Sequence, residues 1–99
     1  MKDELLAISV VQPAMGAKIA STDGVVRVAW TADSRRAQRL LFTILYSNDG
    51  GRRYVYQAFA QTQNWFDVIL DRRVSEHTVK IVASDGAQSS LAVVRFSTA

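Results

Sequence analysis

The sequence contains no cysteine, which excludes disulfide bonds, thiolate zinc sites, iron–sulfur ligation and cysteine nucleophiles. It contains one histidine, His77, so a histidine metal cluster is excluded too, and only calcium held by carboxylates and carbonyls would remain. No Asp-x-Asp cluster supports calcium, and we expect neither a metal nor a cofactor. With one proline and five glycines in 99 residues, the composition excludes collagen-like and low-complexity chains.

Long apolar runs and a strong charge excess are also missing. No apolar run approaches the roughly 18 residues that a membrane-spanning helix needs, so we expect no membrane span. Residues 1–7 carry acidic side chains where a signal peptide carries positive charge, and we expect no signal peptide in this chain. The net charge is only +3, and acidic residues are scattered among the arginines, which argues against a nucleic-acid binder.

The sequence does contain enough apolar side chains for one core, with 48% hydrophobic and 21% charged residues. Its length fits a single domain over residues 1–99, with a core region of 7–97. No linker, charge run or internal repeat divides it. Phosphate-binding glycine loops are absent, and His77 has no nucleophile on a shaped turn to form a catalytic triad. We therefore expect a protein that is not an enzyme.

Short β-rich runs with a period of two alternate with Asp-Gly turns. The run 39–47 is apolar on both faces, which predicts a central strand, whereas the polar stretch 31–38 predicts a loop. Alternation places Tyr54 and Tyr56 on one face of their strand and Phe59 on the other. The predicted strands are 7–12, 18–20, 25–30, 39–47, 53–60, 65–70, 78–84 and 89–96.

About seven strands with turns every 8 to 12 residues, and no helical segment, predict an all-β, antiparallel Greek-key sandwich. We expect its edges to be the sites of association, because edge strands present unpaired backbone groups. The inward-facing positions of the strands predict the centre of the core, which comprises Trp30, Phe42, Ile44, Val79, Ile81, Val94 and Phe96.

Three features resemble fibronectin type III and related bacterial immunoglobulin-like modules: Trp30, the stretch FTILYS at 42–47 and the stretch TVKIVASDG at 78–86. The Pro-Ala-Met-Gly at 13–16 is similar to the Pro-x-x-Gly that follows the first strand of such bacterial modules. The resemblance covers residues 8–97 and rests on order and spacing. It implies an immunoglobulin-like sandwich, a non-catalytic role within a larger bacterial protein, and an extracellular or cell-surface location.

The sequence departs from these families at two places. A tyrosine commonly begins the sixth strand and ties down the preceding corner through its hydroxyl, and His77 stands at that position. An imidazole nitrogen is able to form a hydrogen bond with the same backbone group. Immunoglobulin domains proper carry an inter-sheet cysteine pair, for which the matching strands here offer Val28 and either Ile81 or Val82. We expect packing to replace the disulfide.

The stretch SNDGGRRY at 47–54 resembles an Asp-box, the Ser-x-Asp-x-Gly turn of sialidase propeller blades. Its aspartate is expected to accept backbone N–H bonds inside the hairpin while the aromatic residue covers the turn. One copy cannot form a propeller, so the resemblance describes how the turn is built and implies nothing about sialic acid.

The candidate interaction residues are arginines and aromatics on turns and strands: Arg52, Arg53, Arg72, Arg73, Tyr54, Tyr56 and Trp65. Two arginine pairs at one end of the sandwich would either hold an anionic group or pair with Asp49 and Asp71. The rings would either fill the core or face solvent.

These features predict an accessory or interaction module that binds a protein or positions neighbouring domains of a larger chain. A carbohydrate-binding module is the alternative, in which exposed rings and arginines hold a glycan. That alternative requires Trp65, Tyr54 or Tyr56 to be exposed on one flat face.

Overall fold

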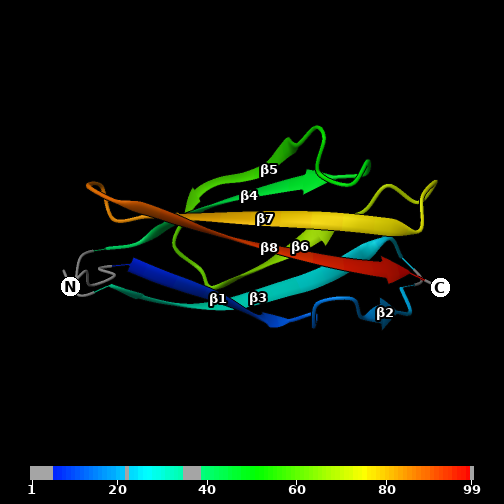
Figure 1. Cartoon of the computed structure of the whole chain (residues 1–99), viewed down its shortest axis with the longest axis horizontal. Coiled ribbons are helices and arrows are strands. Elements are labelled where there is room, and N and C mark those ends of the chain that lie inside the picture. The colour runs from blue at the N-terminus through cyan, green and yellow to red at the C-terminus, as the bar shows by residue number, and fades with distance from the viewer. Residues whose placement is uncertain (1–5, 22, 35–38, 99) are drawn as a thin grey trace.

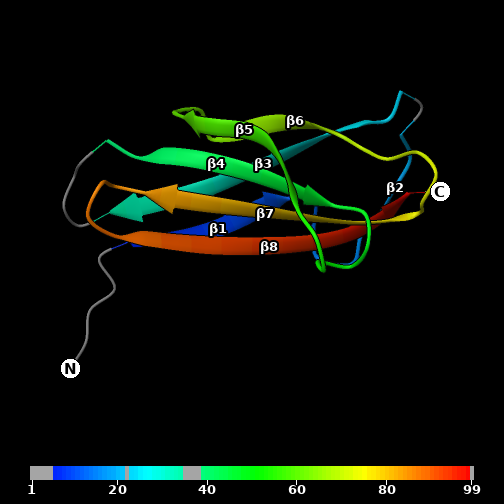
Figure 2. The same ribbon diagram turned by 90° about the horizontal axis from the view of Figure 1, so that it is seen from above.

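The computed structural model describes residues 6–21, 23–34 and 39–98, which form two β-sheets and contain no helix. The strands are β1 (Leu6–Gln12), β2 (Lys18–Ile19), β3 (Val25–Ser34), β4 (Leu41–Ser47), β5 (Val55–Gln61), β6 (Trp65–Ile69), β7 (Glu76–Ser84) and β8 (Ser89–Thr98). β1, β3 and β6 form an antiparallel sheet in that order, and the other strands form a mixed sheet in the order β2-β8-β7-β4-β5. The sheets are two layers around a shared core (Figures 1 and 2). The prediction of an all-β fold is confirmed.

The core lies where the predicted alternation places it. Every side chain predicted for its centre is at most 2% exposed, and Trp30 packs edge-on against Phe42 with ring centroids 5.3 Å apart. Such aromatic pairs contribute about 0.5–1.5 kcal/mol beyond their area burial. Val28 and Ile81 are fully buried at the two positions of the missing disulfide, whereas Val82 is only half-buried. β4 lies between β5 and β7, so the prediction of a central strand is confirmed.

β3 is longer than predicted. It continues to Ser34, although the polar residues from 31 onward predicted a loop. β1 pairs along the whole extension, with Leu6 opposite Ser34 and Ile8 opposite Ala32. The partner strand therefore satisfies the backbone of a segment whose own side chains favour a turn. Residues 35–38 of the predicted loop, and residues 1–5 of the amino-terminal segment, lie outside the described residues.

β5 is bulged at two places, and this overturns one prediction. Tyr56 lies opposite Leu45, whereas Ala58 lies opposite Ile44, so Gln57 is an extra residue. A second irregularity follows before Gln61, where Ala60 has a positive φ of 50°. The extra residue shifts the alternation by one position. The prediction that Phe59 faces away from Tyr56 is therefore wrong.

The loops that carry the predicted arginines lie at one end of the sandwich, the end where β8 finishes (Figure 1). The β4–β5 turn and the β6–β7 loop are joined by a 2.7 Å hydrogen bond from the Asn48 amide to the Asp71 carboxylate. The β2–β3 connection reaches the same end, where Leu70 donates its N–H to the carbonyl of Gly24. Among the described residues there is no helix of the length and apolarity needed to cross a membrane.

Candidate functional site

The solvent side of the five-stranded sheet, which we call the outer face, is largely apolar. One row across it runs from Leu45 to its pairing partner Lys80 and on to Val93, and the next from Thr43 to Val82 and on to Leu91. Strands in a sandwich commonly present polar side chains on this side, and here aliphatic ones dominate. Its central members are Leu41, Thr43, Leu45, Tyr54, Tyr56, Phe59, Lys80, Val82, Leu91, Val93 and Arg95.

The most exposed large side chains of the outer face are Tyr56, Phe59 and Leu91, with 60%, 69% and 56% of their surfaces open to solvent. The rings of Tyr56 and Phe59 stack with centroids 4.5 Å apart and planes inclined by 20°. This pair exists because of the bulge at Gln57. Sequence reasoning missed Phe59 and Leu91, although the apolar alternation on both faces of 39–47 was a signal that this side of the sheet was unusual.

Two cations accompany these apolar side chains. The Lys80 ammonium lies 4.2 Å from the ring centroid of Tyr54, a cation–π contact, and Arg95 is exposed on β8. Within the described ranges, neither Lys80 nor Arg95 makes an ion pair. Glu76 lies at the end of the outer face, where it pairs with Ser97 one row beyond Arg95.

Trp65 does not join the tyrosines. It lies on the other sheet, where the Arg27 guanidinium carbon sits 4.0 Å from its ring centroid. Arg27 also donates two hydrogen bonds to the Asp67 carboxylate, of 2.8 and 3.1 Å. These bonds lower the pKa of Asp67. The arrangement covers one side of the indole, so the predicted aromatic residues belong to two different faces of the sandwich.

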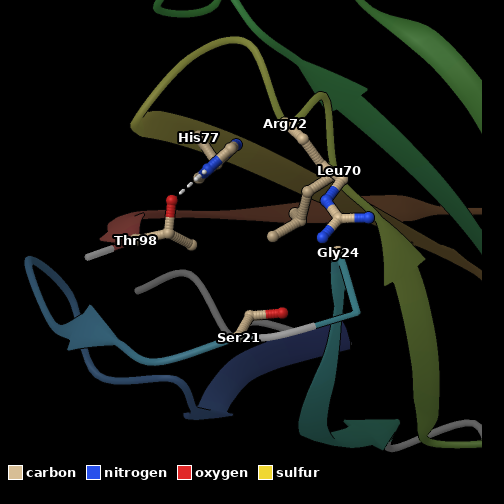
Figure 3. A pocket seen from close by; sticks show the side chains of 6 residues that line it. All are labelled: Ser21, Gly24, Leu70, Arg72, His77 and Thr98. Atoms are coloured by element: carbon tan, nitrogen blue, oxygen red, sulfur yellow. Dashed lines mark hydrogen bonds between the residues drawn. The ribbon is translucent and has the colours of Figure 1, made fainter.

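The predicted arginines are at one end of the molecule but do not form a single cationic site. Arg53 and Arg73 line a groove of about 540 Å³ beside the exposed aliphatic side chains of Val55 and Ile69. Arg72 instead lies over Gly24 in a different pocket of about 210 Å³ (Figure 3). Arg52 is exposed on the β4–β5 turn.

Two of these arginines pair with aspartates, which is one of the two predicted outcomes. Arg53 donates to Asp49 at 3.2 Å, and Arg73 donates two 2.9 Å bonds to Asp71. The bonds from Arg73, with a further one from Asn48, hold the pKa of Asp71 well below its usual range. Asp49 and Asp71 thus neutralise the charges of Arg53 and Arg73. The groove is therefore not a strong site for an anion.

The β4–β5 turn has the internal bonding predicted for it. The Asp49 carboxylate accepts a 2.7 Å bond from the Ser47 hydroxyl and backbone N–H bonds from Arg52 and Arg53. The Ser47 hydroxyl, followed by the backbone N–H and the guanidinium of Arg53, lowers the pKa of Asp49 to about 2. The Tyr54 hydroxyl covers Gly51, where a Cβ atom would approach it to 3.0 Å and where φ is +96°. Glycine is therefore required at that position.

The corner before β7 differs from the prediction for His77. The backbone N–H of Asp71 donates to the Tyr46 hydroxyl at 2.9 Å, and that hydroxyl lies 2.6 Å from Nδ1 of His77. Nε2 of His77 lies 3.1 Å from the Thr98 hydroxyl (Figure 3). Both ring nitrogens of His77 have hydrogen-bond partners when the Tyr46 hydroxyl donates to Nδ1 and Nε2–H donates to the Thr98 hydroxyl. The imidazole therefore supports the tyrosine that binds the corner and does not bind the corner itself.

The edge of β6 is covered by side chains of β5, whereas the expectation that association occurs at the sheet edges stays a prediction for the other edge strands. The Gln57 amide donates to the carbonyl of Ile69 at 2.6 Å and accepts from its N–H at 2.9 Å. The Gln61 amide donates to the carbonyl of Trp65 at 3.0 Å. These amides occupy backbone positions that an added strand would use, and the bulges in β5 make the neighbouring edge irregular.

The described part of the chain brings together no group of three or more His, Cys, Asp or Glu side chains able to hold a metal ion. Both ring nitrogens of His77 are engaged inside the fold. The outer face itself offers apolar contact and the positive charges of Lys80 and Arg95. No protein-family model matches this chain, and neither curated proteins nor solved structures show a significant similarity to it.

Proposed function

We propose that this protein is a non-catalytic interaction module of the fibronectin type III or immunoglobulin-like kind, one unit of a larger bacterial protein. The strand order supports the fold assignment. β1, β3 and β6 lie against β8, β7, β4 and β5, and β2 leaves the side of β1 to pair with β8. This is the order expected of a seven-stranded Greek-key sandwich whose first strand is divided into β1 and β2.

The proposed partner is a protein that binds the outer face. The observation that carries this proposal is the concentration of exposed Tyr56, Phe59 and Leu91 on one sheet surface, among half-buried aliphatic side chains. Aromatic side chains supply much of the affinity at protein interfaces, and contiguous apolar patches on a monomer mark such sites. The buried His77 supports a role without catalysis, because both of its ring nitrogens are hydrogen-bonded to side chains of the fold, although the residue lines the pocket in Figure 3.

The contacts of the rings favour a protein over a glycan. A sugar stacks on a free aromatic face, whereas Tyr56 and Phe59 stack on one another and Tyr54 carries the Lys80 ammonium. Trp65 lies on the opposite sheet beneath Arg27. A carbohydrate-binding module would need these rings together on one open platform.

Selection of a phage-displayed peptide library on the immobilised protein tests this function. Selected peptides are synthesised with a fluorophore, and their dissociation constants are measured by polarisation. We expect Phe59→Ser and Leu91→Ser each to weaken binding about 10-fold, the size of effect that central interface residues show. Val11→Ser is the matched control, because Val11 is 61% exposed but lies on β1. Equal affinities for all variants, or a glycan-array signal that Phe59→Ser abolishes, would contradict the proposal.

A further inference from the structure

We propose that the outer face binds an acidic, apolar peptide segment, whose carboxylates contact Lys80 and Arg95 while its apolar side chains cover Tyr56, Phe59 and Leu91. This inference rests on the proposed function and adds the chemistry of the partner. The segment docks with its side chains onto the face and does not extend the sheet.

The charge pattern of the molecule carries this inference. Lys80 stands in the centre of the sheet between Leu45 and Val93, and Arg95 stands diagonally beside it, opposite Thr78. Diagonal neighbours on a sheet lie roughly 7–8 Å apart, so both cations can contact adjacent carboxylates of one segment. Three other exposed arginines are neutralised by acids of the protein itself, in the pairs Arg27–Asp67, Arg53–Asp49 and Arg73–Asp71, whereas no such pair reaches Lys80 or Arg95 among the described residues.

A second copy of the chain does not fit this face. Two outer faces packed against each other would bring Lys80 and Arg95 of one copy towards the same cations of the other. Glu76, at the margin, is the one acid on this side of β7. Like charges pressed into an interface of low dielectric repel strongly. The partner must therefore bring the carboxylates itself.

The geometry also decides how the partner binds. The amides of Gln57 and Gln61 cover the β6 edge, and the bulges at Gln57 and Ala60 disrupt β5. Strand addition is thereby hindered at the β5 and β6 edges, and the exposed side chains of the outer face are the surface that remains for binding there. The face itself offers apolar rows with only two cations, whereas nucleic acid is held by a longer track of cations that neutralises successive phosphates.

The test uses the peptides selected above, with charge variants of the intact protein. We expect the peptides to be rich in Asp, Glu and apolar residues. Lys80→Glu and Arg95→Glu should each weaken binding about 10-fold, and about 500 mM NaCl should weaken it too. Lys18→Glu makes the same charge change at an exposed residue of β2 and should leave the dissociation constant within about 2-fold. Lys80→Gln and circular dichroism separate lost charge from lost folding.

The outcomes distinguish this inference from the function on which it rests. Peptides that lose affinity with Phe59→Ser but are neutral or basic, and indifferent to Lys80→Glu, would overturn the acidic partner and leave the interaction module intact. Peptides insensitive to Phe59→Ser would overturn both. A fluorescent oligothymidylate, or phosphatidylserine vesicles, binding the wild type but not Lys80→Glu would assign the face to nucleic acid or membrane and would also overturn the inference.

Discussion

The Tyr46 hydroxyl stands between the backbone N–H of Asp71 and the imidazole of His77, and it joins a loop at the surface to a ring that is 1% exposed. The two residues come from β4 and β7, and their rings stack with centroids 5.8 Å apart. The corner is thus held through a relay of two side chains from neighbouring strands, and each depends on the other for its hydrogen bond.

Removing the Tyr46 hydroxyl should reduce stability without changing the shape of the core. Tyr46→Phe leaves the Asp71 N–H and Nδ1 of His77 without their partner, and an unpaired buried polar group costs about 1–3 kcal/mol. Urea unfolding measures the loss. Tyr56→Phe is the control, because its hydroxyl is on an exposed side chain, and it should change the free energy of unfolding by less than about 0.5 kcal/mol. Equal losses in the two variants would contradict the relay.

His77 should make the protein less stable in mild acid. Burial lowers the pKa of His77 from its ordinary 6.5, with Asp71 and Glu76 acting in the opposite direction. The folded state therefore favours the neutral ring, so the unfolded chain binds more protons once the pH falls below that value. The stabilisation is fully present above about pH 6.5 and is lost as the pH falls through the lower pKa of the folded state.

Urea unfolding at about pH 7.5 and about pH 5.5 measures this effect above the range in which carboxylates titrate. His77→Gln keeps a polar side chain that does not titrate, and it should flatten the pH dependence in this window. A wild-type protein whose free energy of unfolding is the same at both values would contradict the assignment of a neutral, buried imidazole.

Asp49 should govern stability in stronger acid. Its pKa is lowered to about 2, first by the Ser47 hydroxyl and then by the backbone of Arg53. A carboxylate with a lowered pKa contributes stability that is present above its ordinary value of 3.8 and is lost as the pH falls through the folded value. Asp49→Asn should lower the melting temperature at neutral pH and reduce its fall between about pH 4 and pH 2. An unchanged acid profile would show that the turn does not depend on this charge.

The amide caps on β6 predict a variant that self-associates. Gln57→Ala together with Gln61→Ala exposes the backbone of Ile69 and Trp65, which then offers hydrogen bonds to another strand. Sedimentation velocity over a concentration series should show more association than for the wild type. Gln63→Ala, the same change at an exposed residue between β5 and β6, is the control and should behave as the wild type. A double variant that associates no more than the wild type would mean that the edge is protected by other means.

Strand positions and the core could be predicted because a period-two alternation is a local property. Phe42, Ile44 and Ile81 are buried for the reason that the pattern indicated. The placement of Phe59 could not be predicted, since a bulge depends on how β5 pairs with β4 and not on its own residues. The continuation of β3 to Ser34 likewise depends on its partner strand.

The candidate site was harder to predict than the fold. The sequence left Tyr56 either in the core or facing solvent, and the cations that accompany it, Lys80 and Arg95, come from strands far away in the sequence. Arginine pairs next to each other in the sequence suggested a joint site, yet Arg72 and Arg73 enter different pockets. The side chains of two residues next to each other in a tight loop can point in different directions, whereas side chains from neighbouring strands can lie side by side. Both arrangements depend on the strand topology, which the sequence pattern does not show.

The elongated shape of the sandwich has a consequence for the larger chain proposed above. β1 begins at one end of a body of 43 × 26 × 22 Å, and β8 finishes at the other (Figure 1). In that larger chain, the two neighbouring domains would attach near opposite ends of the sandwich. Neighbouring domains would then follow one another along the long axis. The outer face, with Tyr56 and Phe59, would remain accessible to a partner.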